Sequence, residues 1–307
     1  MNISVVIPTY NNASMLATTL SAFERVHFPK DAELIVVDNN STDDTAETIN
    51  TFVDKLPVRY AFEPRQGISA AKNRGIDTAR GKLLVFTDDD VRPCPEWLTI
   101  YSDEYRNSPQ GFFWGGPIVS EFEGPMPSES LLRYAPESVK GLDYGSVERS
   151  LEENECFISA NIALPSHAIV EVGGYSTALG LNAKPNLVLA GEETDLQKRL
   201  RSAGYNCKYL PSASIQHVVP ARKCTLEHIA ARIEAHGRYQ RSNVTVEETV
   251  RTLAGVPLWR YRRCAERFSL AWLKRISGRD WYRDYISYRL DKGFLLGIPG
   301  RAVKDQD

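Results

Sequence analysis

Three consecutive aspartates end an apolar run in the first third of this chain. The run is Leu-Leu-Val-Phe at residues 83–86, and Thr87 joins it to Asp88, Asp89 and Asp90. A short continuous apolar run is typical of a strand that is buried on both faces. Adjacent carboxylates repel one another and are costly to bury alone. The pattern therefore indicates either a divalent cation that binds a phosphorylated ligand or a solvated acidic turn that caps a helix.

The first ninety residues alternate between apolar runs and helical patterns. Strands are expected over residues 3–7, 33–37, 58–61 and 83–86, with helices over 14–25, from about 43, and over 67–79. This alternation predicts an α/β fold with parallel strands and crossover helices. Ligands of such sheets bind beyond the carboxyl ends of the strands. Thr9-Tyr10, Asp38-Asn39 and the three aspartates all fall there.

Two common phosphate-binding motifs are missing from the sequence. No GxGxxG follows the first strand, where Pro8-Thr9-Tyr10-Asn11-Asn12 stands instead, and no GxxxxGK[ST] occurs. A nucleotide bound without a glycine-rich loop needs another group to neutralise its diphosphate. A metal ion held by the three aspartates would serve.

Charge and cysteine content narrow the class of protein. The chain has 37 Lys and Arg against 39 Asp and Glu, which argues against bulk nucleic-acid binding. Five scattered cysteines form no CxxC pair, so we expect neither a zinc site nor disulfides. The N-terminus does not resemble a signal peptide, and no window approaches the roughly 20 apolar residues of a membrane span. We therefore expect a cytoplasmic protein, at most peripheral at the inner face of a membrane.

The middle of the chain carries isolated polar and glycine positions at expected strand ends. Trp114 and Gly116 precede a strand at 118–119, where glycines allow either close approach of a ligand or a plain turn. Asn161 is the polar member of an expected strand over 157–164, and residues 123–153 are expected to form a long loop.

The next helix is expected to begin at residue 191 and to carry acids in its first turn. These acids are Glu192, Glu193 and Asp195, and they are expected either to cap the helix or to belong to a functional site. His217 ends an expected strand over 214–217, and Arg222 follows in a positive patch suited to phosphate.

After Thr225 the pattern becomes helical. Helices are expected over 226–239, over 247–253, and from the Pro257 break to about 296. Basic and aromatic residues alternate there, as in segments that lie on an anionic membrane surface. The alternative is a helical bundle that packs on the sheet or on a second copy of the chain.

The order and spacing of these motifs resemble glycosyl transferase family 2, the inverting nucleotide-sugar transferases of GT-A fold. The matching segments are residues 4–11, 37–43, 67–75, 88–90, 173–175 and 191–196. The resemblance implies a mostly parallel sheet flanked by helices. We expect a GT-A catalytic domain over 1–224, divided into a nucleotide-binding half (1–115) and an acceptor half (116–224), and a helical region over 225–307.

The resemblance also implies a role for each matching residue. Asn39 stands where the family often has an aspartate that reads the uracil N3–H, and its carbonyl oxygen can still accept that bond. A UDP-sugar is therefore expected, with dTDP- and GDP-sugars left open. The nucleotide contacts implied are Pro8, Thr9, Tyr10, Asp38, Asn39, Lys72, Asp88 and Asp89. The remaining assignments are Asp90 and His217 for Mg²⁺ or Mn²⁺, Trp114, Gly116, Asn161 and Asp195 for sugar or acceptor, and Arg222 for phosphate.

Glu193 matches the family's catalytic base, which is more often an aspartate, and Glu192 is its nearest rival. The helix after it lacks the QxxRW pattern of processive members, so we expect a single sugar to be added. The resemblance implies a metal-dependent inverting transferase of polysaccharide, glycolipid or glycoconjugate biosynthesis, with a sugar, lipid-linked or protein-linked acceptor. The alternatives are a non-catalytic nucleotide- or carbohydrate-binding module and a nucleotidyltransferase-type enzyme.

Overall fold

The structure, a computed structural model, describes residues 3–108, 111–179, 191–243 and 251–297. The chain divides into two compact units. The first comprises 1–121, 141–187 and 192–219, and the second comprises 122–140, 188–191 and 220–307. The domain boundary predicted between residues 224 and 225 stays a prediction, because a compact unit need not be an independently folding domain.

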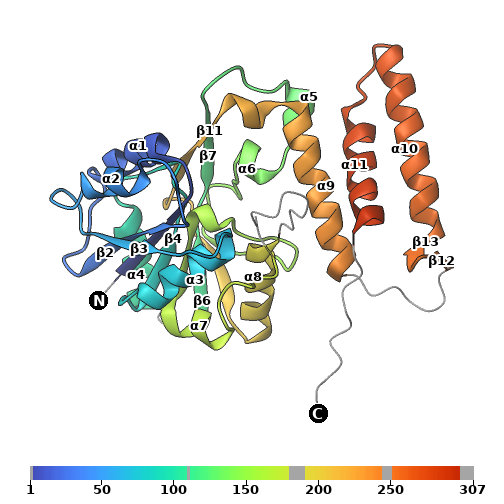
Figure 1. Ribbon diagram of the computed structural model, residues 1–307. Helices are drawn as coiled ribbons and strands as arrows, with labels where there is room; N and C mark the ends of the chain where they lie inside the picture. The colour runs from blue at the N-terminus through green and yellow to red at the C-terminus, as the bar shows by residue number, and fades with distance from the viewer. Residues whose placement is uncertain (1–2, 109–110, 180–190, 244–250, 298–307) are drawn as a thin grey trace. The chain divides into compact units, whose positions relative to one another are not determined.

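A mostly parallel sheet forms the centre of the first unit (Figure 1). Its strand order is β3-β2-β1-β4-β9-β6-β10-β8. The strands are β1 (Ile3–Thr9), β2 (Ala32–Asp38), β3 (Val58–Phe62), β4 (Leu83–Phe86), β6 (Phe112–Gly115), β8 (Arg149–Ser150), β9 (Ile162–Pro165) and β10 (Asn206–Tyr209). The first four strands pair in parallel, and β9 lies antiparallel between β4 and β6. The predicted α/β fold is confirmed.

Helices connect and flank these strands. They are α1 (Ala13–Phe23), α2 (Thr45–Asn50), α3 (Ile68–Thr78), α4 (Trp97–Asn107), α7 (Ser166–Glu171) and α8 (Glu192–Ser202). Small residues let α3 lie close to the sheet, because a Cβ on Gly75 would come within 2.3 Å of the Val6 side chain. The close fit brings the start of α3 to the edge of the sheet where ligands bind in this class of fold.

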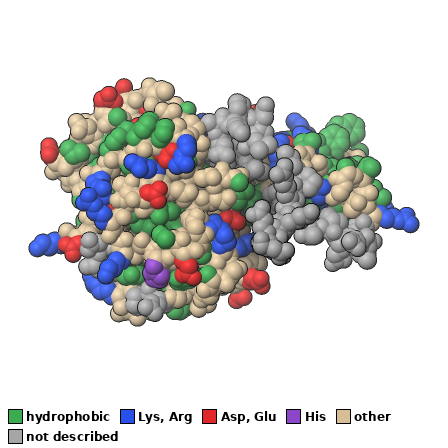
Figure 2. All heavy atoms as spheres, turned by 60° about the horizontal axis from the view of Figure 1, so that its bottom comes forward, with side chains coloured by type: hydrophobic (Ala, Val, Ile, Leu, Met, Phe, Trp, Pro, Cys, Tyr) green, Lys and Arg blue, Asp and Glu red, His purple; other side chains and the backbone are tan. Residues whose placement is uncertain are grey.

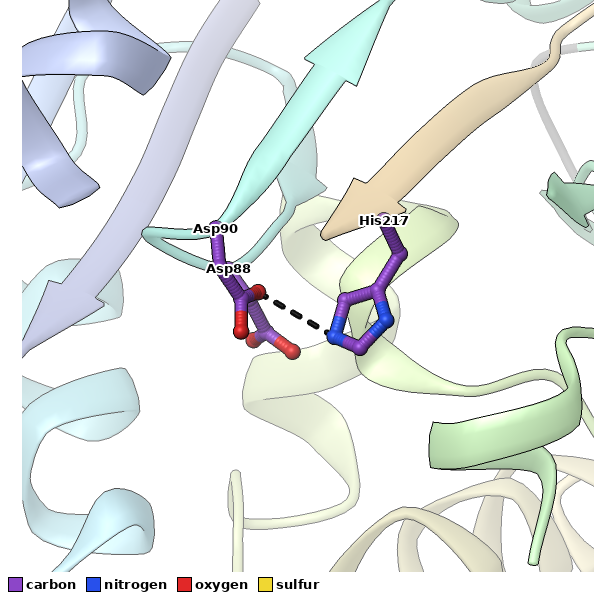
Figure 3. A group of neighbouring side chains, drawn as sticks. All are labelled: Asp88, Asp90 and His217. Atoms are coloured by element: carbon purple, nitrogen blue, oxygen red, sulfur yellow. Dashed lines mark ion pairs between the residues drawn. The ribbon is translucent and has the colours of Figure 1, made fainter. Parts of the chain in front are cut away.

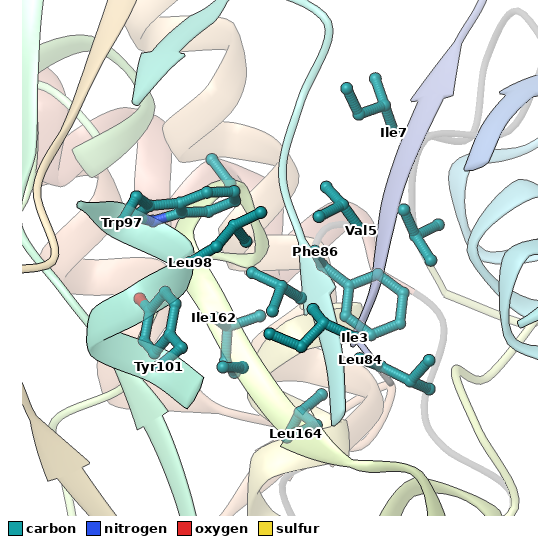
Figure 4. Packing of buried hydrophobic residues seen from close by; sticks show 14 of the residues in the cluster. Ile3, Val5, Ile7, Leu84, Phe86, Trp97, Leu98, Tyr101, Ile162 and Leu164 are labelled. Atoms are coloured by element: carbon teal, nitrogen blue, oxygen red, sulfur yellow. The ribbon is translucent and has the colours of Figure 1, made fainter. Parts of the chain in front are cut away.

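Fully buried apolar side chains from β1, β4, β9 and α4 form one continuous core (Figure 4). Leu84 and Phe86 lie on the same face of β4, and Trp97 and Tyr101 of α4 lie beside Ile162 of β9. Burying each such side chain contributes about 1.5–3 kcal/mol relative to leaving it exposed. This core anchors the end of β4, from which the three aspartates emerge.

A second, three-stranded sheet has the order β5-β11-β7. Its strands are β5 (Val91–Pro93), β11 (Ile215–Val219) and β7 (Ile118–Phe122). Residues 91–93 thus form a strand, and α4 begins four residues further on, at Trp97. The antiparallel pairing sets His217 opposite Val91. This pairing therefore brings β11, the last strand of the first unit, next to the segment that follows the three aspartates.

Two further sequence expectations differ from the structure. The strand predicted over 157–164 begins only at Ile162, because Ser159–Asn161 form a 3-10 turn (η1) whose Asn161 side chain bonds other segments. The predicted loop over 123–153 contains two short helices, α5 (Glu129–Leu132) and α6 (Glu137–Lys140), besides β8.

The second unit is mainly helical, as predicted for the C-terminal region. After the 3-10 turn η2 (Ala221–Cys224), its helices are α9 (Leu226–Asn243), α10 (Leu258–Ile276) and α11 (Tyr282–Leu296). Helix α11 packs closely on α9, because a Cβ on Gly293 would come within 1.9 Å of the Glu234 carbonyl oxygen. None of the helices within the described ranges is long and apolar enough to cross a membrane.

The helix predicted over 247–253 is not found where the structure can test it. Residues 247–250 lie outside the described residues, and β12 (Thr252–Leu253) pairs with β13 (Val256–Pro257) in a hairpin. Ala254 and Gly255 form its turn with φ of 50° and 67°. Positive φ at both central residues is the geometry of a tight hairpin turn, which ends any helix.

Candidate active site

Asp88, Asp90 and His217 meet at the junction of the two sheets of the first unit (Figure 3). One ligand atom from each lies within 4.8 Å of the others. Asp90 is buried, and its Oδ1 lies 3.2 Å from His217 Nε2. The backbone holds this pair in place, since Val218 N–H donates to the Asp90 carbonyl at 2.8 Å.

The aspartates have unfavourable electrostatic surroundings. Burial raises the pKa of the Asp88 carboxyl, the nearby Lys72 opposes that rise, and the charges of Asp90 and Glu193 add to it. Burial and the charge of Asp90 raise the pKa of Asp89 to about 7. Buried like charges of this kind are stabilised when a cation binds among them.

Asp89 is bound differently from its two neighbours. Its carboxylate accepts hydrogen bonds from Thr9 Oγ1 at 2.6 Å and Asn12 Nδ2 at 2.9 Å, and its carbonyl accepts one from Thr19 Oγ1 at 2.8 Å. These bonds tie the end of β4 to the segment after β1. The structure thus gives Asp89 and Thr9 a role in shaping the site, while their predicted nucleotide contacts stay predictions.

The residues present fit a divalent cation. Two carboxylates and one imidazole nitrogen are a usual donor set for such an ion, and carboxylates suit Mg²⁺ and Mn²⁺. His217 Nδ1 is buried and finds no hydrogen-bond partner among the described residues, so the Asp90 contact orients the ring on its own. The sequence assigned Asp90 and His217 to the metal and Asp88 to the nucleoside. The structure groups all three.

A buried polar cluster lies beside the aspartates at the start of α8. Lys72 on α3 is 2% exposed, and its Nζ lies 3.7 Å from Glu192 Oε1 and donates to Ser159 Oγ. Ser159 in turn donates to Glu193 Oε1 at 3.1 Å. Lys72 therefore links both candidate bases, through Ser159 to Glu193 and directly to Glu192. Lys72 is thus buried within this cluster, and its predicted nucleotide contact stays a prediction.

The ring of Tyr175 completes this cluster. Lys72 Nζ lies 4.9 Å from the ring centroid, and the ring packs edge-on against Phe86. The Tyr175 hydroxyl is buried without a hydrogen-bond partner among the residues described. Burial and the charges of Glu193, Glu192 and Asp88 raise the pKa of Tyr175 well above its ordinary value. Tyr175 thus lies near the carboxylates of Asp88, Glu192 and Glu193.

Replacing Lys72 with methionine is expected to lower the free energy of unfolding by about 3 kcal/mol. The change removes the cation from a buried pair and leaves the carboxylate of Glu192 in a site built for two opposite charges. Urea denaturation checks this. The Lys72→Met/Glu192→Gln double variant should recover part of the loss, whereas Lys55→Met, at an exposed lysine, should cost less than about 0.5 kcal/mol. Equal effects at the two lysines would contradict the proposed pair.

The Gly173-Gly174-Tyr175 motif is held by two side chains that the sequence did not connect. Asn73 exchanges two hydrogen bonds with the Tyr175 backbone, both of 2.8 Å. Arg199 donates to the carbonyl of Gly174 at 2.8 Å and pairs with Asp195 at 2.7 Å. Gly174 has φ of 70° and a Cβ there would meet Asn73 Oδ1 at 2.8 Å, so glycine is required. Asp195 therefore positions this turn, and its sugar or acceptor contact stays a prediction.

The predicted base-binding residues lie at the ends of β1 and β2. Asp38 accepts hydrogen bonds from Tyr60 Oη at 3.0 Å and from the Ser41 backbone N–H at 2.8 Å. Burial and the bond to Asp38 raise the pKa of Tyr60 to about 12. Tyr10, in contrast, is half exposed beside them. Pro8, Asp38 and Tyr10 thus lie together at this edge, as predicted from the strand ends, and their base contacts stay predictions.

Asn39 uses its whole side chain to hold the segment that follows β3. Its amide donates to the carbonyls of Glu63 at 3.1 Å and Arg65 at 2.7 Å, and its oxygen accepts from Gly67 N–H at 2.8 Å. One lone pair of that oxygen is therefore already used. The structure gives Asn39 a positioning role that an aspartate could not fill, because a carboxylate cannot donate to two carbonyls.

Trp114 and Asn161 are fully buried, although the sequence suggested contacts with sugar or acceptor. Asn161 accepts from Trp97 Nε1 at 2.8 Å and Tyr101 Oη at 2.7 Å, and donates to the carbonyls of Pro117 and Ala213. Gly116 fits because a Cβ there would come within 2.0 Å of the Ala213 carbonyl oxygen. In this structure these residues hold the sheet together and offer no side-chain surface to a sugar.

Substituting Asn161 with alanine is expected to lower the free energy of unfolding by about 3–5 kcal/mol. Four buried polar groups would lose their partner at once, and each unsatisfied group costs about 1–3 kcal/mol before relaxation. Chemical denaturation measures the loss. Asn107→Ala, at an exposed position on α4, is the matched control and should change stability by less than about 0.5 kcal/mol. A comparable effect at both asparagines would count against this role.

Sequence reasoning missed Ser159, Tyr60 and the structural role of Lys72. Ser159 lay inside a predicted strand, and no spacing rule connects it with Glu193. The signal that could have found Tyr60 is its polar hydroxyl within a strand, two residues before the strand ends. Arg222, the predicted phosphate contact, belongs to the second unit and is exposed, and its contact with phosphate stays a prediction.

Residues 4–134 match the family model described as glycosyl transferase family 2. This match covers less than half of the chain and is a similarity of its N-terminal part to that family. The chain is 28% identical over 211 residues to the glycosyltransferase AglE of Haloferax volcanii, covering 67% of this chain and 64% of the relative. It is 26% identical over 186 residues to the glucosyl-dolichyl phosphate glucuronosyltransferase of the same organism, covering 59% and 58%. The chain thus spans less than two thirds of each relative's length.

Two solved structures share the fold of this chain. The mannosyltransferase PcManGT of Pyrobaculum calidifontis, in complex with GDP-Man and Mn²⁺, has a TM-score of 0.54 at 21% identity and covers 78% of this chain and 61% of its own. TarS 1–349 of S. aureus, in complex with UDP-GlcNAc, has a TM-score of 0.57 at 14% identity and covers 95% and 90%. The GT-A fold predicted from the motifs is therefore confirmed.

Proposed function

We propose that this protein is a metal-dependent inverting glycosyltransferase that moves one sugar from a nucleotide-diphospho-sugar to a hydroxyl acceptor. The observation that carries the proposal is the arrangement of two acidic groups in the first unit. Asp88, Asp90 and His217 form a cation-binding set, and Glu193 lies close enough for its charge to raise the pKa of Asp88. Inverting transfer needs these two parts on either side of the reacting carbon.

The first part of the site binds the donor. Asp88, Asp90 and His217 would hold Mg²⁺ or Mn²⁺, and the imidazole nitrogen favours Mn²⁺, since Mg²⁺ prefers oxygen ligands. A bound divalent ion neutralises charge on the diphosphate leaving group. The half-exposed Tyr10 and the anchored Asp38 would receive the nucleoside at the ends of β1 and β2. UDP is the proposed nucleotide, with dTDP and GDP as alternatives.

Glu193 supplies the second part. The acceptor hydroxyl oxygen forms a bond to the anomeric carbon while the bond from that carbon to the diphosphate oxygen breaks, and the electron pair leaves with the nucleoside diphosphate. Glu193 takes the hydroxyl proton, which makes it the general base. Ser159 holds the Glu193 carboxylate at 3.1 Å in one orientation. Glu192, the rival, is 6% exposed and paired with Lys72, so it is less able to reach an acceptor.

Two other functions compete with this proposal. A non-catalytic binding module would not need an oriented base beside the cation-binding set, yet Ser159 orients Glu193. A nucleotidyltransferase would be expected to carry a Gly- and Lys/Arg-rich segment after β1, where Pro8-Thr9-Tyr10-Asn11-Asn12 stands. The name of one relative includes a dolichyl phosphate-linked sugar, which supports a lipid-linked acceptor as the first class to test.

A donor panel tests the proposed function. The full chain is incubated with UDP-, dTDP- and GDP-sugars, with and without Mn²⁺, and released nucleoside diphosphate is measured. The proposal predicts release from one nucleotide class, dependent on the ion and faster with a hydroxyl acceptor. Release of pyrophosphate would indicate a nucleotidyltransferase, and binding without any release would indicate a binding module.

A further inference from the structure

Helix α10 of the second unit carries an exposed stripe of apolar side chains. Tyr261, Ala265, Phe268, Trp272 and Ile276 follow one another at spacings of four, three, four and four residues, which places them on one face of the helix. Phe268 is 52% exposed, Trp272 59% and Ile276 67%. Leu258 and Leu273 extend the same face and are exposed as well. We call these seven residues the α10 stripe.

The opposite face of α10 already has its partner. Cys264 and Ala271 are buried where α10 packs on α11. Arg263 pairs with Asp291, and Arg267 and Lys274 pair with Asp284, and both acids are 1% exposed. Phe268 of the α10 stripe borders this interface, with its ring centroid 5.1 Å from that of Tyr288 on α11, yet remains 52% exposed. Packing of α10 on α11 therefore leaves most of the apolar surface of Trp272 and Ile276 uncovered.

The charge around the stripe is strongly positive. Residues 251–297 contain eleven of the 37 Lys and Arg of the chain but only four of its 39 Asp and Glu. Two of those four acids are the buried Asp284 and Asp291. Arg262 and Arg275 on α10, with Arg279 and Arg283 after it, are exposed. Figure 2 shows hydrophobic side chains gathered on this unit with Lys and Arg side chains beside them.

This combination identifies the chemistry of the partner. Trp, Tyr and Phe rings are favoured at the boundary between lipid headgroups and acyl chains, and exposed arginines are attracted to anionic headgroups. A second copy of the chain is a poorer fit, because a two-fold interface through the stripe would bring the arginines of both copies together. We propose that the α10 stripe docks on the surface of an anionic lipid bilayer, with α10 lying in the plane of the interface.

Vesicle flotation with the full-length chain tests this docking. The wild type should float with vesicles of phosphatidylcholine and phosphatidylglycerol but not with phosphatidylcholine alone, and added salt should weaken the association. The Phe268→Ser/Trp272→Ser variant should lower the partition coefficient roughly tenfold or more, because it removes the apolar anchor. The Arg262→Glu/Arg275→Glu variant should lower it by a similar factor, and only on anionic vesicles.

Two controls separate docking from general stickiness. Val170→Ser removes an equally exposed apolar side chain from the first unit, and Arg25→Glu reverses an exposed charge there. Both should leave flotation unchanged, and circular dichroism should show all variants folded. Failure of the wild type to bind anionic vesicles at low salt, or binding that survives both double variants, overturns the proposal. The proposal is also overturned if the wild type is a dimer that binds no vesicles and the Phe268→Ser/Trp272→Ser variant is a monomer. Donor turnover of the double variants on a water-soluble acceptor keeps this test separate from that of the proposed function.

Discussion

Asp90→Asn is expected to abolish ion-dependent donor binding and to lower sugar transfer roughly 10²–10³-fold. Asp90 is buried, lies 3.2 Å from His217, and shares a 4.8 Å cluster with Asp88. Asparagine keeps the size and one oxygen of the side chain, so the fold should survive while the charge that attracts the cation is lost. Calorimetric titration of the nucleotide with and without Mn²⁺ measures the binding, and nucleoside diphosphate release measures the turnover.

Two matched variants make this result specific. Asp103→Asn changes an exposed carboxylate on α4 and should leave both measurements unaltered. Asp89→Asn removes an acceptor of hydrogen bonds from Thr9 and Asn12, so we expect it to lower thermal stability more than ion affinity. Donor binding by Asp90→Asn that still responds to Mn²⁺ as in the wild type would mean that the cation binds elsewhere.

Glu193→Gln is expected to lower transfer roughly 10²–10⁴-fold, the usual contribution of a general base, with little change in donor affinity. Glutamine cannot take the acceptor proton. It can still accept the Ser159 hydrogen bond of 3.1 Å, so the local geometry is kept. Steady-state kinetics with saturating donor, together with calorimetry of donor binding, separates the two effects, because loss in kcat with unchanged donor affinity points to chemistry rather than binding.

Glu192→Gln distinguishes the two neighbouring carboxylates. Glu192 is buried against Lys72, so this variant should lose stability while keeping most of its turnover. If Glu192→Gln loses the larger part of kcat and Glu193→Gln does not, the base has been assigned to the wrong residue. Near-normal turnover in both variants would place the base outside the first turn of α8.

The parts of the fold that are regular in sequence could be predicted from it. Strands β1, β2 and β4 are continuous apolar runs, and each ends in polar residues at the same edge of the sheet. That edge is where Asp88, Asp90 and Asp38 lie. The alternation of strands and helices was enough to predict that these three residues lie at one edge of the sheet.

Long-range hydrogen bonds could not be predicted in this way. Asn161 looked like a ligand because it is a polar residue in an apolar run, yet its partners lie 44 to 64 residues away in sequence. Ser159 and Lys72 are joined across 87 residues, and Asn73 and Tyr175 across 102. Buried polar residues must find partners, but their sequence does not say which ones.

Local exceptions to the helical pattern also escaped prediction. A helix was expected over residues 247–253, but β12 and β13 pair in a hairpin whose turn has positive φ at Ala254 and Gly255. Strand β5 has three residues and is defined by its pairing with β11, not by its own composition. That pairing is what brings His217 to the aspartates, so the sequence suggested His217 as a ligand only through the family resemblance.

Pulsed electron paramagnetic resonance of Mn²⁺ added to the full chain with UDP, GDP or dTDP tests whether Asp88, Asp90 and His217 bind the cation. We expect bound Mn²⁺ that couples to one histidine nitrogen in the presence of the preferred nucleotide. His217→Gln should remove that coupling, and Asp88→Asn/Asp90→Asn should remove the bound ion. Bound Mn²⁺ without nitrogen coupling, or a spectrum that these variants leave unchanged, would contradict a cation site made of Asp88, Asp90 and His217.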